Sequence, residues 1–573
     1  MNEKDLKYKI LVVLSVVIVI AFDVFFVSKK EGYHMDEILS YELSNSEFTP
    51  WITPTQPEGR LEKYYRNEIY NSSFPVLVSN LFSQVSDIVK RRSASTAAGY
   101  TADVYDTPRW MSSEDITEYV TYYRKDSVIA LSAYYNSTTD NHPPLYFMLL
   151  NIVSAIYSLI AFGKLSVWPG CILNMIFMAG SLIVINLFFR DVAGKRYLGP
   201  VAAVLYGLSP AGINTVVLIR MYSMTAFWCL AFTYLILKRF IEGDDFRRKN
   251  KALIAVTVLG YLTQYFVCIY FFFLTGCLAV YLICKKKKKT LKNIIKAMVI
   301  SGVWGIALYP FVFHDLFGTK IGDSVIGNLS GFSGFAEKLK AFTVLMAEGT
   351  SWSVYSALFV LLAVLFAGAA AIAKHRMRAW APMLCVSAAG YLLTVSKIAP
   401  YTVDRYLMPV FPIVSICIVL GVGYAITFLA ETFISSDKAE RNVKALSYGA
   451  AFIMVIGLAF TVNPGYLFSG YLAQERLSER YSGYDAIAVY EGTGFYRNVP
   501  ELMNYGNCLL LKEDETSVFD ERIDSLDSVV LIEGIGVDRD RVIKTFGDMY
   551  GFSSLTVLME DGVHGDRVCL LSK

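Results

Sequence analysis

The chain has 573 residues with a net charge of +3, and 54% of its residues are hydrophobic. A mean hydropathy of +0.43 excludes an ordinary soluble globular protein and predicts an α-helical polytopic membrane protein. The small net charge says little by itself, and we expect no nucleic-acid partner.

The N-terminal segment predicts a retained membrane anchor. Lys4, Lys7 and Lys9 precede an apolar run at residues 10–27. Because lysines collect on the cytoplasmic side of a span, this first helix should run outward. The run has no small-residue cleavage site, so residues 1–28 are expected to stay as a cytoplasmic tail and first transmembrane helix.

An acidic pair, Asp36 and Glu37, follows this helix directly, with His34 beside it. Carboxylates at a membrane boundary are costly to desolvate and often mark a functional site. One interpretation is a general base with a partner that orients the acceptor. The other is a helix cap with acids in the first turn of the next helix. The pattern alone leaves both open.

Residues 29–142 are polar and predict a first extracytoplasmic loop, with short helices at 58–69 and 112–123. The chain returns to the membrane at Asp140-Asn141-His142-Pro143-Pro144. Proline in a first helical turn explains the two prolines. It does not explain why an aspartate and a histidine crowd the same boundary.

Residues 143–463 predict a multi-span domain, and we expect about 11–13 transmembrane helices in all. The run at 253–283 is too long for one helix, so we divide it near Thr263-Gln264-Tyr265. A second outer loop is expected at 314–351. The other expected spans are 144–160, 171–189, 197–218, 221–237, 297–313, 352–373, 379–395, 406–433 and 445–462.

Basic clusters orient these spans by marking cytoplasmic loops. They occur at residues 238–239, 247–248, 285–289, 374–378 and 438–444. One conflict arises, because the basic segment 190–196 falls outside under strict alternation. Either segment 144–160 does not fully cross the membrane, or the pattern hides one further span.

Two arginines are expected at the outer membrane face. Arg220 lies between two spans, and Arg405 follows Asp404 at a later boundary. A guanidinium can bind a lipid phosphate with two parallel hydrogen bonds. The alternatives are an interfacial anchor for Arg220 and a simple pair with Asp404 for Arg405.

A metal site is a further alternative. His34, Asp36, Glu37 and His142 have suitable side chains, but no fixed ligand spacing supports a site. We therefore expect no metal and no other cofactor, with a divalent cation as the minor alternative.

Residues 464–573 predict a small extracytoplasmic α/β domain. Short helices are expected at 499–504 and 538–546. Cys508 and Cys569 could pair if this domain lies outside, and the sequence leaves that open. The expected strands are 486–490, 508–511, 528–533, 555–559 and 568–571.

Together these motifs resemble the polytopic GT-C glycosyltransferases, over about residues 10–462. The closest branches are the bacterial protein mannosyltransferase-like and aminoarabinose transferase-like enzymes. The resemblance rests on the acidic pair, the long outer loop, His142-Pro143-Pro144-Leu145-Tyr146, Arg220-Met221-Tyr222-Ser223 and Arg405-Tyr406-Leu407-Met408-Pro409. The chain departs from relatives at Leu218-Ile219, where they often have Glu-Ala, and at Gln264, where they often have His.

The resemblance implies an inverting transfer of a sugar from undecaprenyl phosphate to an acceptor outside a bacterial plasma membrane. Asp36 would be the base. Glu37, with His34 and Asp140, would hold the acceptor or the sugar. Arg220, Arg405 and His142 would bind the donor phosphate, and the further donor-site candidates are Tyr146, Tyr222, Tyr265 and Tyr406.

Three rival classes remain. A lipid-linked sugar flippase or transporter would place ionisable residues near the bilayer midplane. An oligosaccharide ligase or polymerase would use similar arginines without needing the acidic pair. A membrane-anchored binding protein would work through the C-terminal domain. The motifs select neither the sugar nor the acceptor, whether glycan, lipid or protein.

Overall fold

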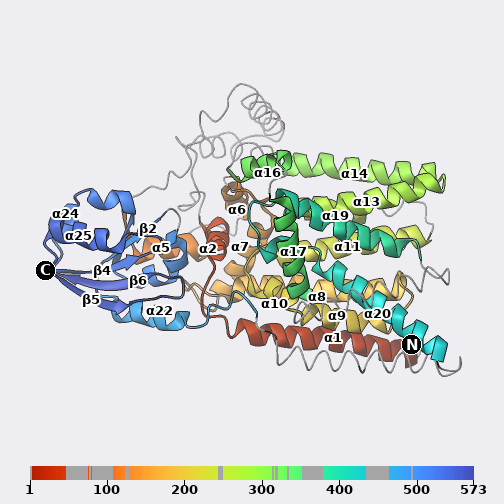
Figure 1. The fold of residues 1–573 in the computed structure, drawn as a ribbon, viewed down its shortest axis with the longest axis horizontal. Helices are drawn as coiled ribbons and strands as arrows, with labels where there is room; N and C mark the ends of the chain where they lie inside the picture. The colour runs from red at the N-terminus through yellow and green to blue at the C-terminus, as the bar shows by residue number, and fades with distance from the viewer. Residues whose placement is uncertain are drawn as a thin grey trace.

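A computed structural model gives the fold as a helical bundle with a mixed sheet at one end (Figure 1). The structure describes residues 3–46, 75, 79, 108–122, 130–138, 140–242, 250–312, 315, 320–331, 334–350, 378–433, 449, 462, 464–491 and 494–573. The N-terminus lies at the far end of the bundle from the sheet, and the C-terminus lies within the sheet.

Seven of the described helices are long and apolar enough to cross a membrane, which confirms the polytopic helical class. Two expected spans, 352–373 and 445–462, lie outside the described residues, so the expected total stays a prediction. The seven are α1 (Glu3–Val27), α8 (Trp168–Asp191), α11 (Tyr222–Glu242), α13 (Phe266–Cys284), α14 (Lys288–Leu308), α19 (Trp380–Ile398) and α20 (Phe411–Phe433).

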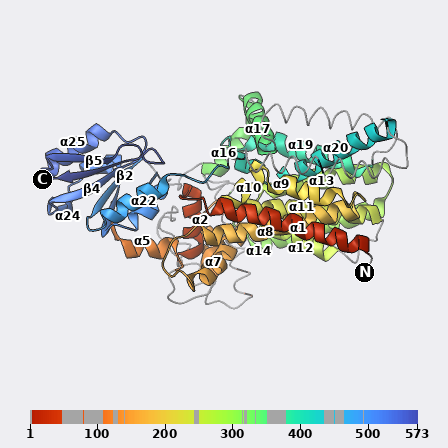
Figure 2. The same cartoon turned by 90° about the horizontal axis from the view of Figure 1, so that it is seen from below.

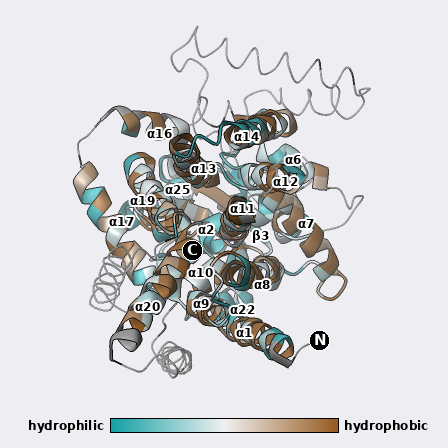
Figure 3. Ribbon diagram, turned by 90° about the vertical axis from the view of Figure 1, so that its right-hand side faces the viewer, coloured by the Kyte–Doolittle hydropathy of each residue, from teal (hydrophilic) through white to brown (hydrophobic). Residues whose placement is uncertain are grey.

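The bundle turns apolar side chains outward, as a lipid-facing surface requires. Figure 3 looks along the bundle and shows apolar residues on the outer sides of α1 and α14. On α14, Val299, Val303 and Trp304 are all more than half exposed. Such exposure would be unfavourable in water over so large an area.

The expected span at 197–218 is a bent pair, α9 (Leu198–Gly207) and α10 (Pro210–Val217), with 59° between its halves. Ser209 caps α10 by accepting a hydrogen bond from the Gly212 amide, and Pro210 occupies its first turn. A Cβ atom at Gly212 would lie 2.1 Å from the Tyr206 carbonyl oxygen, so the bend needs glycine there.

Helix α7 (Leu145–Ser158) bears on the orientation conflict, because it is shorter than the span expected at 144–160. Its 14 residues span about 21 Å, less than a hydrocarbon core. Its first amide donates to the Leu262 carbonyl, and Tyr157 near its end bonds Ser166 just before α8. Both ends therefore lie at the sheet end of the bundle.

Helix α8 then carries the basic segment 190–196 to the N-terminal end of the bundle. There Tyr8 of α1 donates to the Asn186 carbonyl at 3.0 Å, and Arg196 pairs with Asp5 at 2.7 Å. These contacts favour the first of the two explanations offered above, and the choice between them stays a prediction.

This arrangement predicts opposite accessibility for Lys164 and Arg196, both exposed. In a chain with Cys284→Ser and Cys385→Ser, which removes both exposed cysteines, we expect Lys164→Cys and Arg196→Cys to react with an impermeant maleimide from opposite sides of sealed vesicles. Reaction of Arg196→Cys from the side of the sheet region, with Lys164→Cys on the opposite side, would mean that α7 crosses; reaction of both from the same side would mean that α8 does not cross.

Short helices gather at the sheet end, between the bundle and the sheet (Figure 2). The expected helix at 112–123 is present as α5, whereas the one at 58–69 lies outside the described residues. The division near Thr263 is also confirmed, because α12 ends at Tyr261 and α13 begins at Phe266. The helices at the sheet end are α2 (Met35–Asn45), α5 (Ser113–Val120), α6 (Ala130–Ser137) and α16 (Lys320–Ser330), whereas α12 (Asn250–Tyr261) runs within the bundle and α17 (Phe335–Thr350) packs on α10 and α19.

The sheet has six strands in the order β1-β3-β2-β4-β6-β5. Strands β3, β2 and β4 are parallel, and the other pairings are antiparallel. All five expected strands are confirmed within one residue at each end. The strands are β1 (Arg109–Ser112), β2 (Ala486–Tyr490), β3 (Asn507–Lys512), β4 (Ser528–Glu533), β5 (Ser554–Met559) and β6 (Arg567–Ser572).

Strand β1 was not predicted, and it comes from the first loop rather than from the C-terminal segment. It pairs with β3, so the sheet joins the two parts of the chain. Helix α25 (Arg539–Tyr550) covers one face of the sheet. The other face packs on α23 (Val499–Leu502) and the 3-10 helix η4 (Gly494–Asn498).

Cys508 and Cys569 do not form a disulfide. Strands β2 and β4 separate their two strands, and the side chains belong to hydrophobic clusters on opposite faces of the sheet. The pairing that the sequence left open is therefore excluded by geometry.

Two carboxylates, Glu501 and Asp566, are buried together beside the sheet, each 1% exposed. Gln474 Nε2 donates to Glu501 at 2.8 Å and to Asp566 at 2.5 Å. Asn498 Nδ2 donates to the same two oxygens at 3.0 and 2.9 Å. Burial, followed by the charge of Asp566, raises the pKa of Glu501 to about 8.

This raised pKa predicts that stability falls as the pH rises from about 4.5 to about 8, because the folded chain keeps a proton that the unfolded chain releases. The glutamine in Glu501→Gln keeps a side-chain oxygen that can accept hydrogen bonds from the Gln474 and Asn498 amides, but it has no group that titrates in this pH range. We expect its melting temperature to exceed that of the wild type by several degrees at pH 8 and by less at pH 5. Glu479→Gln is the control, because Glu479 is exposed. An equal rise in melting temperature for this control at pH 8 would contradict the raised pKa of Glu501.

Segment 464–470 connects the bundle to α22 (Tyr471–Arg480) and lies against the end of α1. The Glu31 amide donates to the Leu467 carbonyl at 2.8 Å, and the Gly470 amide donates to the Glu31 carboxylate at 2.5 Å. Gly32 packs so closely on Tyr471 that an added Cβ atom would lie 2.8 Å from the ring. The C-terminal segment is thus held against the start of α2.

Candidate active site

Helix α2 begins with a capping box, which accounts for part of the acidic motif. His34 Nδ1 accepts the Asp36 amide at 3.1 Å, and the Glu37 carboxylate accepts the His34 amide at 2.6 Å. Burial lowers the pKa of His34 to about 4, so its imidazole is neutral at physiological pH. The helix-cap interpretation therefore holds for His34 and Glu37.

Glu37 is fully buried and all its hydrogen bonds are internal. It forms an ion pair with Lys30 at 3.1 Å, and both side chains are 0% exposed. Its other oxygen accepts the Ile219 amide at 2.7 Å. Glu37 therefore joins the end of α1, the start of α2 and the turn that carries Arg220. This geometry favours a structural role over contact with a sugar.

Asp36 turns its carboxylate away from this buried pair and toward Arg405, with which it forms an ion pair. Arg220 Nη1 donates to the Asp36 carbonyl at 3.3 Å and to Ser40 Oγ at 3.0 Å. Arg220 also lies over the Phe147 ring at 5.9 Å. The two arginines therefore hold the acidic residue from two sides, although 369 and 184 positions separate them from it.

The electrostatics keep Asp36 ionised. Burial raises the pKa of its carboxyl, but Arg220 and Arg405 outweigh that effect and hold the pKa below its ordinary value. The side chains of Asp36 and Arg405 are 17% and 15% exposed. An ionised carboxylate in partial contact with solvent can accept a proton from a hydroxyl.

Asp140 and His142 form a second polar pair, with 2.9 Å between Asp140 Oδ2 and His142 Nδ1. Burial raises the pKa of Asp140, but His142 and Arg220 outweigh it, so the pKa is lowered overall. The pair precedes α7, whose first amide donates to the carbonyl of Leu262, the residue that follows α12. Arg220 thus acts electrostatically on both acidic residues.

The four tyrosines take different places. Tyr222 is 2% exposed and lies two residues after Arg220, and Tyr406 packs on Phe266 with 5.2 Å between ring centroids. Tyr146 is wholly buried. Tyr265 donates to the buried Asp315 at 2.5 Å. Tyr222 and Tyr406 therefore lie close in the chain to Arg220 and Arg405, whereas Tyr146 lies in the protein interior and Tyr265 is only partly buried.

One expectation needs correction, because Asp404 is not the partner of its neighbour Arg405. Asp404 accepts a hydrogen bond from Tyr466 at 2.6 Å and one from Asn214 at 3.4 Å. Arg405 reaches across to Asp36 instead. The contribution of Tyr466 has no signal in the sequence, since it lies in an irregular segment between the bundle and the sheet region.

The site therefore has two layers. Lys30, Glu37 and Arg220 form an inner layer, and each of these residues is at most 7% exposed. The outer layer is partly exposed, and its members are Asp36, Arg405, His34 and His142. Among the residues that the structure describes, no three His, Cys, Asp or Glu side chains come together as metal ligands.

Comparison with known proteins gives a likeness of overall shape. ArnT from Cupriavidus metallidurans bound to undecaprenyl phosphate is 11% identical, with 97% of each chain covered and a TM-score of 0.49. Its apo structure is 12% identical, with 75% of this chain and 87% of that chain covered and a TM-score of 0.42.

Archaeal oligosaccharyltransferase AglB from Archaeoglobus fulgidus, in complex with an inhibitory peptide and a dolichol-phosphate, is 11% identical. The match covers 79% of this chain and 69% of that chain, with a TM-score of 0.40. No family model and no curated protein matches the sequence.

Proposed function

We propose that this protein is a membrane glycosyltransferase that moves a sugar from a polyprenyl-phosphate donor to an acceptor on the outer face of a bacterial plasma membrane. The observation that carries the proposal is the ionised Asp36, held by Arg220 and Arg405 at the sheet end of the bundle. A base and a phosphate-binding cation side by side suit transfer from a phosphate-linked donor. In this proposal the sheet region is extracytoplasmic.

The proposed reaction is a single inverting displacement. The acceptor oxygen forms a bond to the anomeric carbon while the bond from that carbon to the phosphate oxygen breaks. The acceptor proton passes to Asp36, and the electron pair leaves with the polyprenyl phosphate. Arg405 and His142 stabilise the charge that develops on the phosphate.

The layers of the site divide the work. Arg405 and His142 are partly exposed and can meet a phosphate, whereas Arg220 is buried and contacts Asp36 and Ser40. We therefore assign Arg220 to positioning the base. Glu37 holds the turn before Arg220, and Asp140 orients His142.

The test is sugar transfer by the full-length protein in proteoliposomes, with undecaprenyl-phosphate-linked monosaccharides and cell-envelope extract. Arg405→Gln should weaken donor binding roughly 10- to 100-fold, because a charged hydrogen-bond donor is lost. Arg405→Lys keeps the positive charge but loses the planar guanidinium. Its affinity for the donor should lie between that of the wild type and that of Arg405→Gln. The measurement is the donor concentration needed for half-maximal transfer.

Two results would contradict the proposal. Movement of the lipid-linked sugar across the bilayer without transfer would favour a flippase. Transfer only from a pyrophosphate-linked oligosaccharide would favour a ligase or polymerase.

A further inference from the structure

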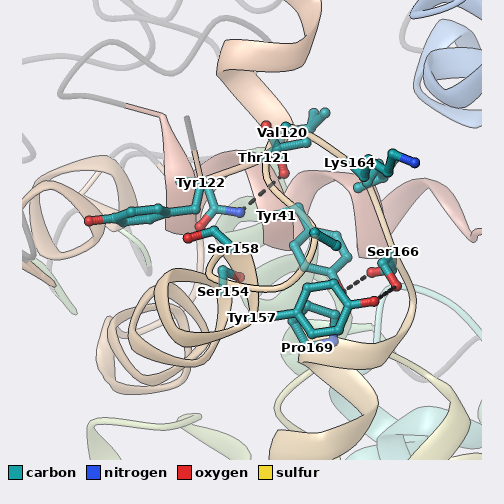
Figure 4. Close-up of a pocket in the computed structure, with 14 residues that line it drawn as sticks. Tyr41, Val120, Thr121, Tyr122, Ser154, Tyr157, Ser158, Lys164, Ser166 and Pro169 are labelled. Carbon is teal, nitrogen blue, oxygen red and sulfur yellow. Dashed lines mark hydrogen bonds between the residues drawn. The ribbon is translucent and has the colours of Figure 1, made fainter. Parts of the chain in front are cut away.

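The narrow pocket between α2, α5 and α7 is too small for an acceptor (Figure 4). It leaves about 20 Å³ for the centre of a water-sized group, which is room for about one water. Tyr41 lines this pocket and already donates a hydrogen bond to the Ser166 carbonyl at 2.7 Å. An acceptor for Asp36 therefore has to be held by groups outside the pocket.

The C-terminal segment packs directly against the start of α2, where the proposed base lies. The 3-10 helix η4 contacts α2. An added Cβ atom at Gly32 would lie 2.8 Å from the Tyr471 ring and 2.9 Å from Phe468 Cβ. The His34 ring faces the Tyr466 ring, with 6.1 Å between their centroids. The outer layer of the active site therefore borders on the C-terminal segment.

A group of stacked rings holds this border in place. The centroid of the His564 ring lies 5.3 Å from that of Phe468 and 5.6 Å from that of Tyr471. The ammonium of the buried Lys30 lies over the Phe468 ring, 5.0 Å from its centroid. Tyr471 also donates a hydrogen bond to the Arg497 carbonyl at 3.1 Å. The rings thus fix the backbone of Arg497 near the start of α2.

Arg497 is a partly exposed cation in an acidic part of the chain. Residues 464–573 contain more Asp and Glu than Lys and Arg. Even so, the Arg497 guanidinium forms no hydrogen bond and no ion pair with any residue that the structure describes. Burial, followed by the charge of Arg497, lowers the pKa of His564 to about 4. Burial also lowers the pKa of His34, and Arg497 adds to that effect. A guanidinium beside two neutral histidines, without a carboxylate partner, is suited to bind an anion.

We propose that Arg497 selects an acceptor that carries an anionic group, a phosphate or a carboxylate, near the hydroxyl that receives the sugar. This inference rests on the proposed function. Arg405 and His142, which are assigned to the donor phosphate, come from the bundle, whereas Arg497 comes from the sheet region. The acceptor then places its hydroxyl at Asp36 and its anionic group at Arg497. Arg497 determines specificity and takes no part in the displacement.

The test is sugar transfer by the full-length protein in proteoliposomes, with undecaprenyl-phosphate-linked monosaccharides as donors. Cell-envelope extract, separated by anion exchange into a neutral and an anionic fraction, supplies the acceptor. At limiting acceptor, we expect the wild type to transfer about ten-fold faster or more to the anionic fraction.

Arg497→Gln should raise the amount of anionic fraction needed for half-maximal transfer by about ten-fold or more. The rate at saturating acceptor and the donor concentration for half-maximal rate should change little, because the lost contact is to the acceptor alone. Arg497→Lys keeps the charge and should lie between the wild type and Arg497→Gln. Arg480→Gln is the matched control, because Arg480 is an exposed arginine at the end of α22.

The outcomes separate this inference from the proposed function. Absence of transfer to both fractions by the wild type would contradict the proposed function itself. Transfer that does not distinguish the fractions, or equal effects of Arg497→Gln and Arg480→Gln, would overturn the role of Arg497 alone. A higher donor requirement in Arg497→Gln would also overturn it, because Arg497 would then contact the donor.

The nature of the anion follows from a second treatment of the anionic fraction. Aqueous hydrogen fluoride cleaves phosphate esters and leaves carboxylates. Loss of transfer after this treatment would identify the anion as a phosphate, and unchanged transfer that still depends on Arg497 would identify a carboxylate. Melting curves show whether each variant is folded.

Discussion

Asp36→Asn is expected to lower sugar transfer by roughly 10²- to 10⁴-fold while donor binding is retained. Asparagine has the same shape as aspartate, but it cannot take a proton from the acceptor. Its carbonyl oxygen can still accept a hydrogen bond from Arg405, which pairs with Asp36 in the native chain. The loss should therefore appear in kcat, with little change in the donor concentration needed for half-maximal rate.

The control for this variant is Asp115→Asn. Asp115 also lies in the first turn of a helix, and its carboxylate caps α5. If Asp36 were only a first-turn acid, both variants would have equally small effects on stability and none on transfer. Normal transfer by Asp36→Asn would show that another group takes the proton.

Glu37→Ala is expected to have a different and mainly structural effect, a loss of about 3–5 kcal/mol in the free energy of unfolding. The substitution leaves Lys30 charged and buried, and it removes the acceptor for the His34 and Ile219 amides. The change is measured by thermal unfolding in a single detergent.

Two further variants make this prediction specific. Lys30→Met combined with Glu37→Leu should recover much of the stability, because no unpaired charge then remains buried. Asp5→Ala breaks the exposed pair with Arg196 and should cost no more than about 1 kcal/mol. Full stability with greatly reduced sugar binding in Glu37→Ala would instead support direct contact between Glu37 and substrate.

Adjacent residues on a helix project about 100° apart, and this explains why the sequence could not divide the roles of the acidic pair. Glu37 faces the protein interior and Lys30, whereas Asp36 faces Arg405. The choice depends on where residues 30, 219 and 405 lie in space. That information is in the tertiary structure and not in the spacing of the motif.

Elsewhere the local pattern was sufficient. Continuous apolar runs bounded by polar turns predicted strands β2 to β6, and the overlong run at 253–283 predicted the break between α12 and α13. Strand β1 was not predicted, because four residues are too few to show a periodic pattern. Its partner β3 is also far away in the sequence. Hydropathy also could not show that both ends of α7 lie at the sheet end of the bundle.

The ion pair between Asp36 and Arg405 implies an order of events for the proposed transfer. While the arginine is engaged with the carboxylate, its charge makes the carboxylate a poor proton acceptor. A donor phosphate that draws Arg405 toward itself raises the basicity of Asp36 at the moment when a reactive sugar is in place. Without its donor the enzyme then holds only a weak base, and Asp36 becomes an effective proton acceptor only after the lipid-linked sugar has bound.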